Sequence, residues 1–503
     1  MVKKFIIFIL LGLSTLMVWM LWNMSTFYSK QINISNLITK NKIDFLSEEK
    51  TLSDLSKKEE LILNLSESLK YKTISYQDSN YSEPIHFLSF HKFLERVYPK
   101  VFSQLEKRIF SNYSLLLKWE GVNNTPHNPI LFMAHMDVVP IENYNLWDHP
   151  PFSGNIDNEY VWGRGALDDK SSLIAILESI EYLLDSGFSP NRDIYFAIGH
   201  DEENSGIRGN AVIADSLASE GIYFDMIIDE GSVITDGIIP GMDKPVAIVG
   251  VAEKGYASFE LICNHESGHS SMPNNETTIG MLAKAIVALE TNKMPAELTD
   301  PVISFFNFLG PEMTIQDRFF LSNSSFFATS ILNNLDTNPI TSAMVRTTIA
   351  PTIINGGLKS NILPSTAKAV VNYRIRQGDS IDRVKKHITS TINNDLISVS
   401  QLKSDLSAEP SKVSSTKSPE FHIIHKSIKE VFGDVIVSPG MILATTDSRH
   451  YQNISKNIYR FMPIQLSSND LSMIHGANEK ISIESYMKMI EFYIHLIQNI
   501  HAS

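Results

Sequence analysis

Three short apolar runs constrain the fold of this 503-residue chain more than any other feature. They cover residues 130–134, 193–198 and 225–228, and the second and third each begin with an aspartate. Continuous apolar runs of this length are typical of strands that are buried on both faces of a sheet. A helical pattern separates the first two runs, with apolar side chains at Leu173, Ile174, Leu177, Ile180 and Leu184. Strands that alternate with helices predict an α/β domain with a mainly parallel sheet and helices on both faces.

A different pattern predicts a second, smaller domain within the first. Residues 257–263 alternate between apolar and polar side chains, which indicates a half-exposed antiparallel strand. Residues 400–418 are rich in Ser, Lys and Pro and are typical of a linker between domains. Because the chain is also too long for a single core, we expect an α/β domain at 31–256 and 406–503, interrupted by an α+β domain at 257–405.

The N-terminus predicts a membrane segment over residues 1–30. Lys3 and Lys4 precede an apolar run from Phe5 to Trp22, which as a helix spans about 27 Å, close to the thickness of a bilayer core. Lysines before the run place the N-terminus in the cytoplasm and the remainder of the chain outside it. The run ends in Trp-Met-Leu-Trp instead of the small residues of a cleavage site. We expect an uncleaved signal anchor, with a cleaved signal peptide and secretion as the alternative.

Composition excludes several classes of protein. The single cysteine, Cys263, excludes a disulfide framework and a thiolate zinc finger. A net charge of −13 argues against binding to nucleic acid, which requires a basic face. The segment Gly163–Asp168 lacks the third glycine and the preceding strand of a dinucleotide-binding loop. Any metal site in this chain must therefore be built from His, Asp and Glu.

Polar clusters follow each of the three predicted strands, and an acidic pair begins the helix after the first. Ligands of parallel sheets bind at the carboxyl ends of the strands, so these clusters are expected to converge. Each cluster alone is common in loops and helix caps, but together they indicate one site. Crowded carboxylates repel one another unless cations are bound, and His with carboxylates suits one or two ions such as Zn²⁺. The predicted members are His135, Asp137, Asp168, Glu202, Glu203, Asp229 and Glu230.

Six motifs occur in an order that resembles one known family: His135-Met-Asp137, Gly163-Arg-Gly-Ala-Leu-Asp168-Asp-Lys170, Asp201-Glu-Glu203, Asp229-Glu-Gly231, Gly268-His-Ser-Ser271 and Ile474-His-Gly476. The family is the dinuclear-zinc aminoacylase/carboxypeptidase metallopeptidases. The resemblance covers roughly residues 55–500. Within the family it is greatest to the branch of vacuolar Gly-X carboxypeptidase and N-fatty-acyl-amino-acid synthase/hydrolase.

The resemblance implies a role for each site residue. Two zinc ions would be held by His135, Glu203, His475, the bridging Asp168, and one member of the pair Asp229 and Glu230. Asp137 would orient the His135 ring, and Glu202 would act as the general base. His269 in the inserted domain would steady the carbonyl oxygen, across either the domain gap or a subunit interface. The predicted contacts to the substrate carboxylate are Asn361, Arg374 and Arg449.

The implied function is a zinc-dependent hydrolase that cleaves the amide bond next to a free carboxylate. Its substrates would be N-acyl amino acids or short peptides, and the inserted domain would serve as a lid and as a possible homodimer interface. The apolar stretches at 303–309 and 319–327 fit either an acyl pocket or a core. A non-catalytic, membrane-tethered binding protein is the alternative function, but every expected site position is occupied.

Overall fold

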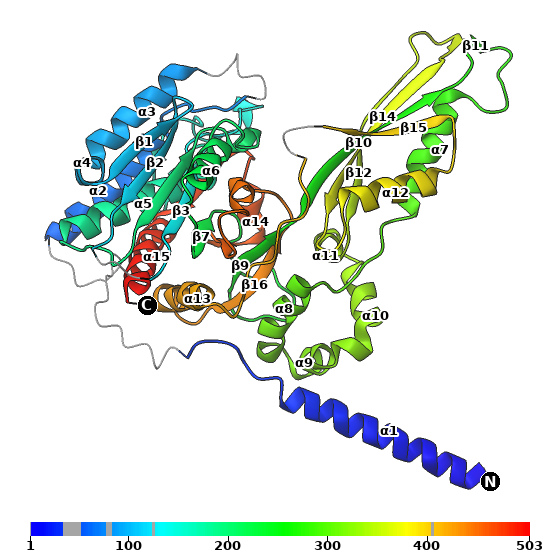
Figure 1. Cartoon of the computed structure of the whole chain (residues 1–503), viewed down its shortest axis with the longest axis horizontal. Coiled ribbons are helices and arrows are strands. Elements are labelled where there is room, and N and C mark those ends of the chain that lie inside the picture. The colour runs from blue at the N-terminus through cyan, green and yellow to red at the C-terminus, as the bar shows by residue number, and fades with distance from the viewer. Residues whose placement is uncertain (1, 34–51, 77–82, 123–125, 404–406, 503) are drawn as a thin grey trace.

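The three apolar runs form adjacent parallel strands at the centre of a ten-stranded sheet. In the computed structural model, which describes residues 2–33, 52–76, 83–122, 126–403 and 407–502, strand β3 (Ile130–His135) lies between β6 (Ile194–Gly199) and β7 (Met226–Asp229) (Figure 1). Phe132 is opposite Phe196 on one side and Ile228 on the other, and both pairings are parallel. Every residue of these strands is buried, as their continuous apolar sequence predicts.

The outer strands complete the sheet with mixed directions. Its order is β1-β2-β6-β3-β7-β17-β9-β8-β18, and β16 pairs in parallel with β9. The strands at one edge are antiparallel, whereas β17 continues the parallel centre beside β7. The additional bounds are β1 (Glu106–Phe110), β2 (Ser114–Trp119), β8 (Ile234–Thr235), β9 (Val246–Glu253), β16 (Ile436–Ile442), β17 (Ile458–Arg460) and β18 (Gln465–Leu466).

Helices cover both faces of this sheet, which confirms the predicted α/β class. On one face, α5 (Lys170–Asp185) and α15 (Ile483–His501) share the main core with the sheet and with α2 (Leu52–Ser68), α3 (Pro84–Val97), α4 (Pro99–Gln104) and α13 (Pro419–Phe432). The other face packs against α6 (Asn210–Ser219) and the 3₁₀ segment η6 (Asp447–Tyr451). A small sheet, formed by β4 (Asn155–Ile156), β5 (Tyr160–Trp162) and β19 (Lys480–Ser482), joins early and late parts of the chain.

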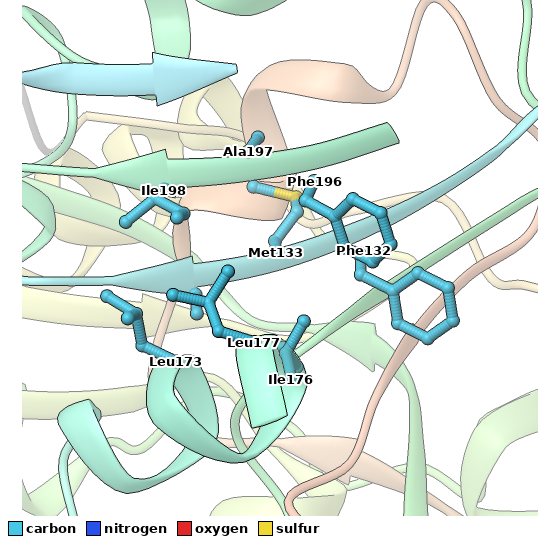
Figure 2. A pocket seen from close by; sticks show the side chains of 9 residues that line it. Phe132, Met133, Leu173, Ile176, Leu177, Phe196, Ala197 and Ile198 are labelled. Atoms are coloured by element: carbon cyan, nitrogen blue, oxygen red, sulfur yellow. The ribbon is translucent and has the colours of Figure 1, made fainter. Parts of the chain in front are cut away.

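The contact between α5 and the sheet is almost completely filled. Figure 2 shows the side chains around the space that remains between them, which has a volume of about 10 Å³. This volume is at the lower limit for a single water molecule, and its lining is apolar. The cavity is therefore a packing defect of the core and not a substrate site.

A buried carboxyl on α5 gives the fold a predictable pH dependence. Burial raises the pKa of Glu178 from 4.5 to about 7, although Asn64 and Tyr98 donate hydrogen bonds to Oε1 at 2.8 and 2.9 Å. The folded state thus favours the protonated carboxyl. The contribution of Glu178 to the free energy of unfolding is fully present below pH 4.5 and is lost as the pH rises through 7. Ionisation of Glu178 should lower the free energy of unfolding by about 3 kcal/mol between pH 4.5 and 8, and we expect this decrease to be absent in Glu178→Gln. Melting temperatures measured across this pH range test the prediction, with Glu60→Gln as the control at an exposed glutamate. If the melting temperature depended on pH in the same way in both variants and in the parent protein, the prediction would be wrong.

The interrupting segment contains a separate antiparallel sheet of four strands in the order β12-β14-β10-β15. The predicted alternating strand is β10 (Gly255–Asn264), which pairs with β14 (Thr366–Ile375) and β15 (Ile397–Leu402). Helices α7 (Thr278–Thr291) and α12 (Ile381–Ile392) pack on one face of this sheet, and β12 (Thr348–Gly356) forms an edge. The short strands β11 (Gly268–His269) and β13 (Ile362–Leu363) pair at its tip (Figure 1). The domain end predicted at 405 lies outside the described residues, so the boundaries remain a prediction.

Four helices within this segment lie away from the four-stranded sheet. Helix α8 (Asp300–Leu309) packs on β16 of the large sheet, where Phe305 and Leu309 form a core with Val246 and Ile436. It is followed by the 3₁₀ turn η5 (Gly310–Glu312), α9 (Ile315–Ser322), α10 (Ser324–Leu335) and α11 (Pro339–Val345). Helix α9 contacts α1 (Val2–Ser25), which among the described residues is the one helix long and apolar enough to cross a membrane.

Candidate metal centre

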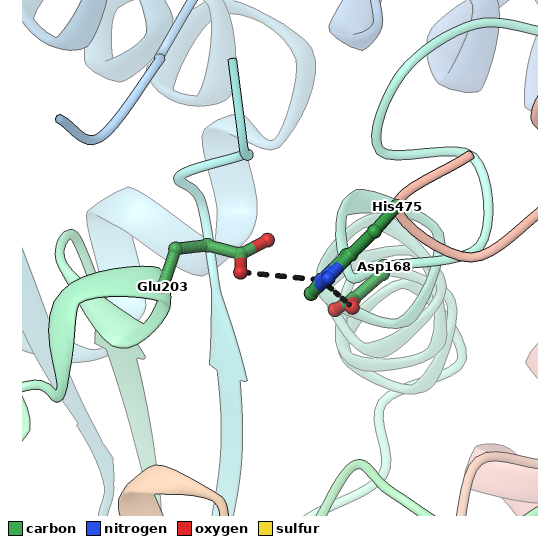
Figure 3. Close-up of side chains that lie close together, drawn as sticks. All are labelled: Asp168, Glu203 and His475. Atoms are coloured by element: carbon green, nitrogen blue, oxygen red, sulfur yellow. Dashed lines mark ion pairs between the residues drawn. The ribbon is translucent and has the colours of Figure 1, made fainter. Parts of the chain in front are cut away.

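A carboxylate lies between two histidines at the carboxyl end of the large sheet. Asp168 Oδ1 is 3.0 Å from Nε2 of His135, and its Oδ2 is 3.0 Å from Nε2 of His475. His135 ends β3, Asp168 precedes α5, and His475 comes from a loop more than 300 residues later. Figure 3 shows Glu203 on the opposite side of His475, with its Oε2 3.2 Å from the same Nε2. The structure thus brings together four of the predicted metal ligands.

Asp137 joins the ends of two neighbouring strands beneath this cluster. Its carboxylate accepts hydrogen bonds from the backbone N–H groups of Glu202 and Glu203, both at 3.2 Å. His135 Nδ1 lies 3.0 Å from the Asp137 carbonyl oxygen, which leaves Nε2 directed at Asp168. Asp137 is fully buried and therefore fixes both the imidazole and the loop that carries the two glutamates.

A buried ion pair links the loops of Asp168 and His475. Glu479 accepts a hydrogen bond from Arg164 Nη1 at 2.6 Å and others from the backbone N–H groups of Leu167 and Asp168. Arg164 also donates to the carbonyl oxygen of His475 at 3.1 Å. Neither Arg164 nor Glu479 was among the predicted site residues, although Arg164 lies inside the motif of Asp168 and Glu479 follows the motif of His475. Arg164 lies four residues before Asp168, and Glu479 lies four residues after His475. This spacing was the one sign in the sequence that the two could support the site.

The two adjacent acids at the end of β7 differ in their contacts. One Asp229 oxygen accepts from the backbone N–H of Glu230, and the other accepts from the N–H of Ser448, both at 3.0 Å. The Asp229 carboxylate thus contacts the backbone on both sides and keeps one further lone pair on each oxygen. Burial and then the charge of Asp168 raise the pKa of Glu230 well above its usual range.

The cluster fits a divalent cation. Asp168 and Glu203 raise the pKa of the His475 imidazole to about 10. Without a metal, the protonated imidazole therefore supplies the positive charge between the two carboxylates. Oε1 of Glu203 is buried and has no hydrogen-bond partner in the described structure. A divalent ion would satisfy this oxygen and replace the proton, because a histidine must be neutral to bind a metal.

One arginine lies against the loop that follows Glu203, and a second is near enough for their charges to interact. Arg449 donates to the carbonyl oxygen of Ser205 at 2.7 Å, and the guanidinium of Arg374 lies over the Tyr256 ring at 4.7 Å. Burial lowers the pKa of Arg374, and the nearby charge of Arg449 lowers it further. Two guanidinium groups that repel each other in this way form a natural site for an anion.

The other two predicted lid residues do not join the metal cluster within this chain. His269 is exposed on β11, where its Nδ1 lies 2.7 Å from the hydroxyl of Ser271. The carbonyl oxygen of Asn361 accepts from the Ser270 N–H at 3.2 Å, so Asn361 lies beside it. Figure 1 places β11 at the far tip of the four-stranded sheet, away from β7.

Comparison with known families agrees with the motifs. Residues 131–499 match the family described as peptidase family M20/M25/M40. The chain is 41% identical to probable carboxypeptidase S-like 2 of Dictyostelium discoideum over 95% of this chain and 90% of that protein. It is 38% identical to N-fatty-acyl-amino acid synthase/hydrolase PM20D1 of Xenopus tropicalis, over 90% and 88% of the two chains.

A solved structure shares the fold. The M20 family metallo-carboxypeptidase Sso-CP2 from Sulfolobus solfataricus superposes with a TM-score of 0.63, covering 88% of this chain and 99% of that one. The sequence identity is 19%, so this likeness concerns the arrangement of the two sheets and not the substrate.

Proposed function

Because the chain belongs to peptidase family M20/M25/M40 and is therefore a peptidase or amidohydrolase, we propose that it uses two zinc ions to cleave the amide bond next to a free carboxylate. The observation that carries the proposal is Asp168, whose two oxygens face the Nε2 atoms of two different histidines. One carboxylate between two imidazoles matches a bridging ligand of a dinuclear centre. The alternative of a non-catalytic binding protein has no support in these relatives.

The proposed ligands are divided between the two ions that share Asp168. His135 and one of the two acids at the end of β7 would hold one ion, and Glu203 and His475 would hold the other. When bound, the ions would make a water more acidic and polarise the scissile carbonyl. Zinc fits because histidine nitrogens and carboxylate oxygens are ligands it accepts, and the chain's one cysteine, Cys263, is buried in the other sheet and takes no part in the site.

The remaining chemistry belongs to the side chains. Glu202 follows β6 next to the ligand Glu203, and the Asp137 carboxylate fixes its backbone. It takes a proton from the attacking water and later gives it to the departing amine. Arg374 and Arg449 bind the substrate carboxylate through charge-assisted hydrogen bonds, which orients the amide bond for attack.

A substrate panel tests this assignment. The proposal predicts hydrolysis of N-acyl amino acids or of dipeptides with a free C-terminus, and loss of hydrolysis when the same compounds carry a C-terminal amide. Both long-chain and short-chain acyl groups belong in the panel, because the relatives include both a carboxypeptidase and a fatty-acyl hydrolase. Equal cleavage of acids and amides would reject recognition of a free carboxylate.

Glu230 is the proposed ligand of the pair at the end of β7, because within the described residues its carboxylate makes no hydrogen bond and lies close enough to Asp168 for their charges to interact, whereas both oxygens of Asp229 accept backbone hydrogen bonds. We expect Glu230→Gln to lose about one equivalent of zinc and Asp229→Asn to retain both. Metal content by mass spectrometry, together with melting temperature as a check on folding, compares the two variants. A folded Asp229→Asn variant that loses zinc while Glu230→Gln keeps it would reverse the assignment.

We further propose that His269 acts in the site of a second copy. It is exposed at a distance from its own metal cluster, and β12 offers an unpaired edge with Ile353 and Ile354 53% and 60% exposed. Co-expression of His269→Ala with Glu202→Gln is expected to restore part of the activity that each lacks alone. Only in a mixed dimer does one active site contain an intact Glu202 from its own chain together with an intact His269 from the partner chain. No recovery in mixed dimers that form would show that His269 does not act across subunits.

The N-terminal helix α1 is proposed as an uncleaved anchor with the catalytic part outside the cytoplasm. Its apolar side chains from Phe5 to Leu13 are exposed in the fold, whereas a core helix would bury them. Lys3 and Lys4 at its start set the orientation.

A further inference from the structure

Helices α9 and α10 carry a cluster of four phenylalanines, of which Phe320 and Phe326 are exposed and the other two are partly buried. Phe319 and Phe320 on α9 lie against Phe327 on α10, with ring centroids 6.0 and 4.8 Å away, and Phe326 lies 5.0 Å from Phe327. No residue within either helix is buried, and Phe326 is 57% exposed. Helix α10 carries no charged side chain over its 12 residues. An exposed apolar surface on uncharged helix is typical of an interaction site.

The cluster lies directly beside the outer end of α1. Asn323, which joins α9 to α10, is buried, and its amide nitrogen donates to the carbonyl oxygen of Met20 at 3.2 Å. The side-chain nitrogen of Asn23 donates to the Asn323 oxygen at 2.9 Å. Figure 1 shows α9 next to this end of α1, with α10 packed on α9. The anchor therefore sets the position of the cluster.

The chain after α1 holds this arrangement through further contacts. Arg318 of α9 donates to the carbonyl oxygen of Phe27 at 2.9 Å, and the Phe27 ring packs so close to Gly310 that a Cβ there would be 2.5 Å away. Gln31 exchanges two hydrogen bonds of 2.9 Å with the backbone of Val437 in β16. Residues 20–31 are thus docked on the catalytic domain.

The aromatic residues of α1 mark the level of the membrane boundary. Trp19 and Trp22 are exposed near the end of the apolar run, and tryptophans concentrate at the interface between the hydrocarbon and water. Asn323 contacts α1 at Met20 and Asn23, which lie at the same level. The phenylalanine cluster next to Asn323 therefore lies at the height of the lipid headgroups.

We propose that α9 and α10 form a membrane-interface element, in which the phenylalanine cluster inserts among the lipids of the outer leaflet beside α1. The proposal rests on the proposed anchoring by α1. Continuity with the anchor favours lipid as the occupant of this surface over a second protein. The element would hold the catalytic domain against the bilayer at two places, α1 and the α9–α10 pair, and so restrict its tilt.

Spin labels on the full chain in phosphatidylcholine nanodiscs test the proposal. The single native cysteine, Cys263, is fully buried, so new cysteines can be labelled selectively. Labels at Phe326→Cys and, as a second position, Ile315→Cys report on the element; Leu11→Cys reports on α1, and Ile109→Cys on the distant edge strand β1. Collision rates with oxygen, which enters lipid, and with a water-soluble nickel chelate are then compared.

The proposal expects the oxygen-to-nickel ratio at 326 and 315 to exceed the ratio at 109 several-fold, as the ratio at 11 does. If the label at 11 lies in lipid while those at 326 and 315 behave like the label at 109, the interface element is wrong and the anchor stands. If the label at 11 also behaves like the label at 109, the anchor fails and the element with it. Spin–spin broadening at 326 that disappears on dilution with unlabelled protein would overturn lipid in favour of a second copy.

Discussion

Glu202→Gln is expected to lower kcat by about 10²- to 10⁴-fold while both zinc ions remain bound. Glutamine keeps the size of the side chain but cannot accept the proton of the attacking water. The backbone N–H of residue 202 would still donate to Asp137, so the loop should keep its place. Initial rates on the best substrate of the panel and the metal content of the same preparation measure the two effects.

The adjacent residue supplies the matched control. Glu203 lies 3.2 Å from His475 and has one unpartnered buried oxygen, so Glu203→Gln is expected to lose metal as well as activity. The two variants remove the same charge from neighbouring positions. If Glu202→Gln lost metal to the same extent as Glu203→Gln, Glu202 would be a ligand and not the base.

Asp168→Asn is expected to have the largest effect on metal content. Both Asp168 oxygens lie 3.0 Å from a histidine nitrogen, so this one side chain contributes to both proposed ions. Loss of its charge should reduce bound zinc from two equivalents to less than one, and hydrolysis should fall with it. Asp185→Asn, an exposed carboxylate at the end of α5, is the control and should change neither quantity. An Asp168→Asn variant that retains two equivalents would contradict the bridging role.

The parallel centre of the sheet and the convergence of its polar ends could be predicted from the sequence. Burial on both faces requires continuous apolar strands, and parallel strands necessarily place their carboxyl ends at one edge. This rule brings His135 and Glu203 together from strand ends 68 positions apart in the chain. Asp168 was predicted from its place at the start of the helix after the first strand, whereas its bridging role and the ligand His475 came only from the family resemblance, because no periodic pattern places the loop of His475.

Other features depend on contacts between distant segments. Glu479 is fully buried because it caps the loop of Asp168, but a glutamate beside a lysine has the pattern of a solvent-exposed loop. The apolar stretches at 303–309 and 319–327 look alike in sequence. The first packs on β16 and forms core, whereas the second lies exposed beside α1. Only the position of α1 and β16, far away in the sequence, distinguishes them.

The metal content of the purified full-length protein tests the central claim most directly. Inductively coupled plasma mass spectrometry of the active protein should find close to two equivalents of zinc per chain, and removal by a chelator should abolish hydrolysis until zinc or cobalt is added back. Less than one equivalent of divalent metal, with no gain in hydrolysis on addition of zinc or cobalt, would contradict the dinuclear mechanism.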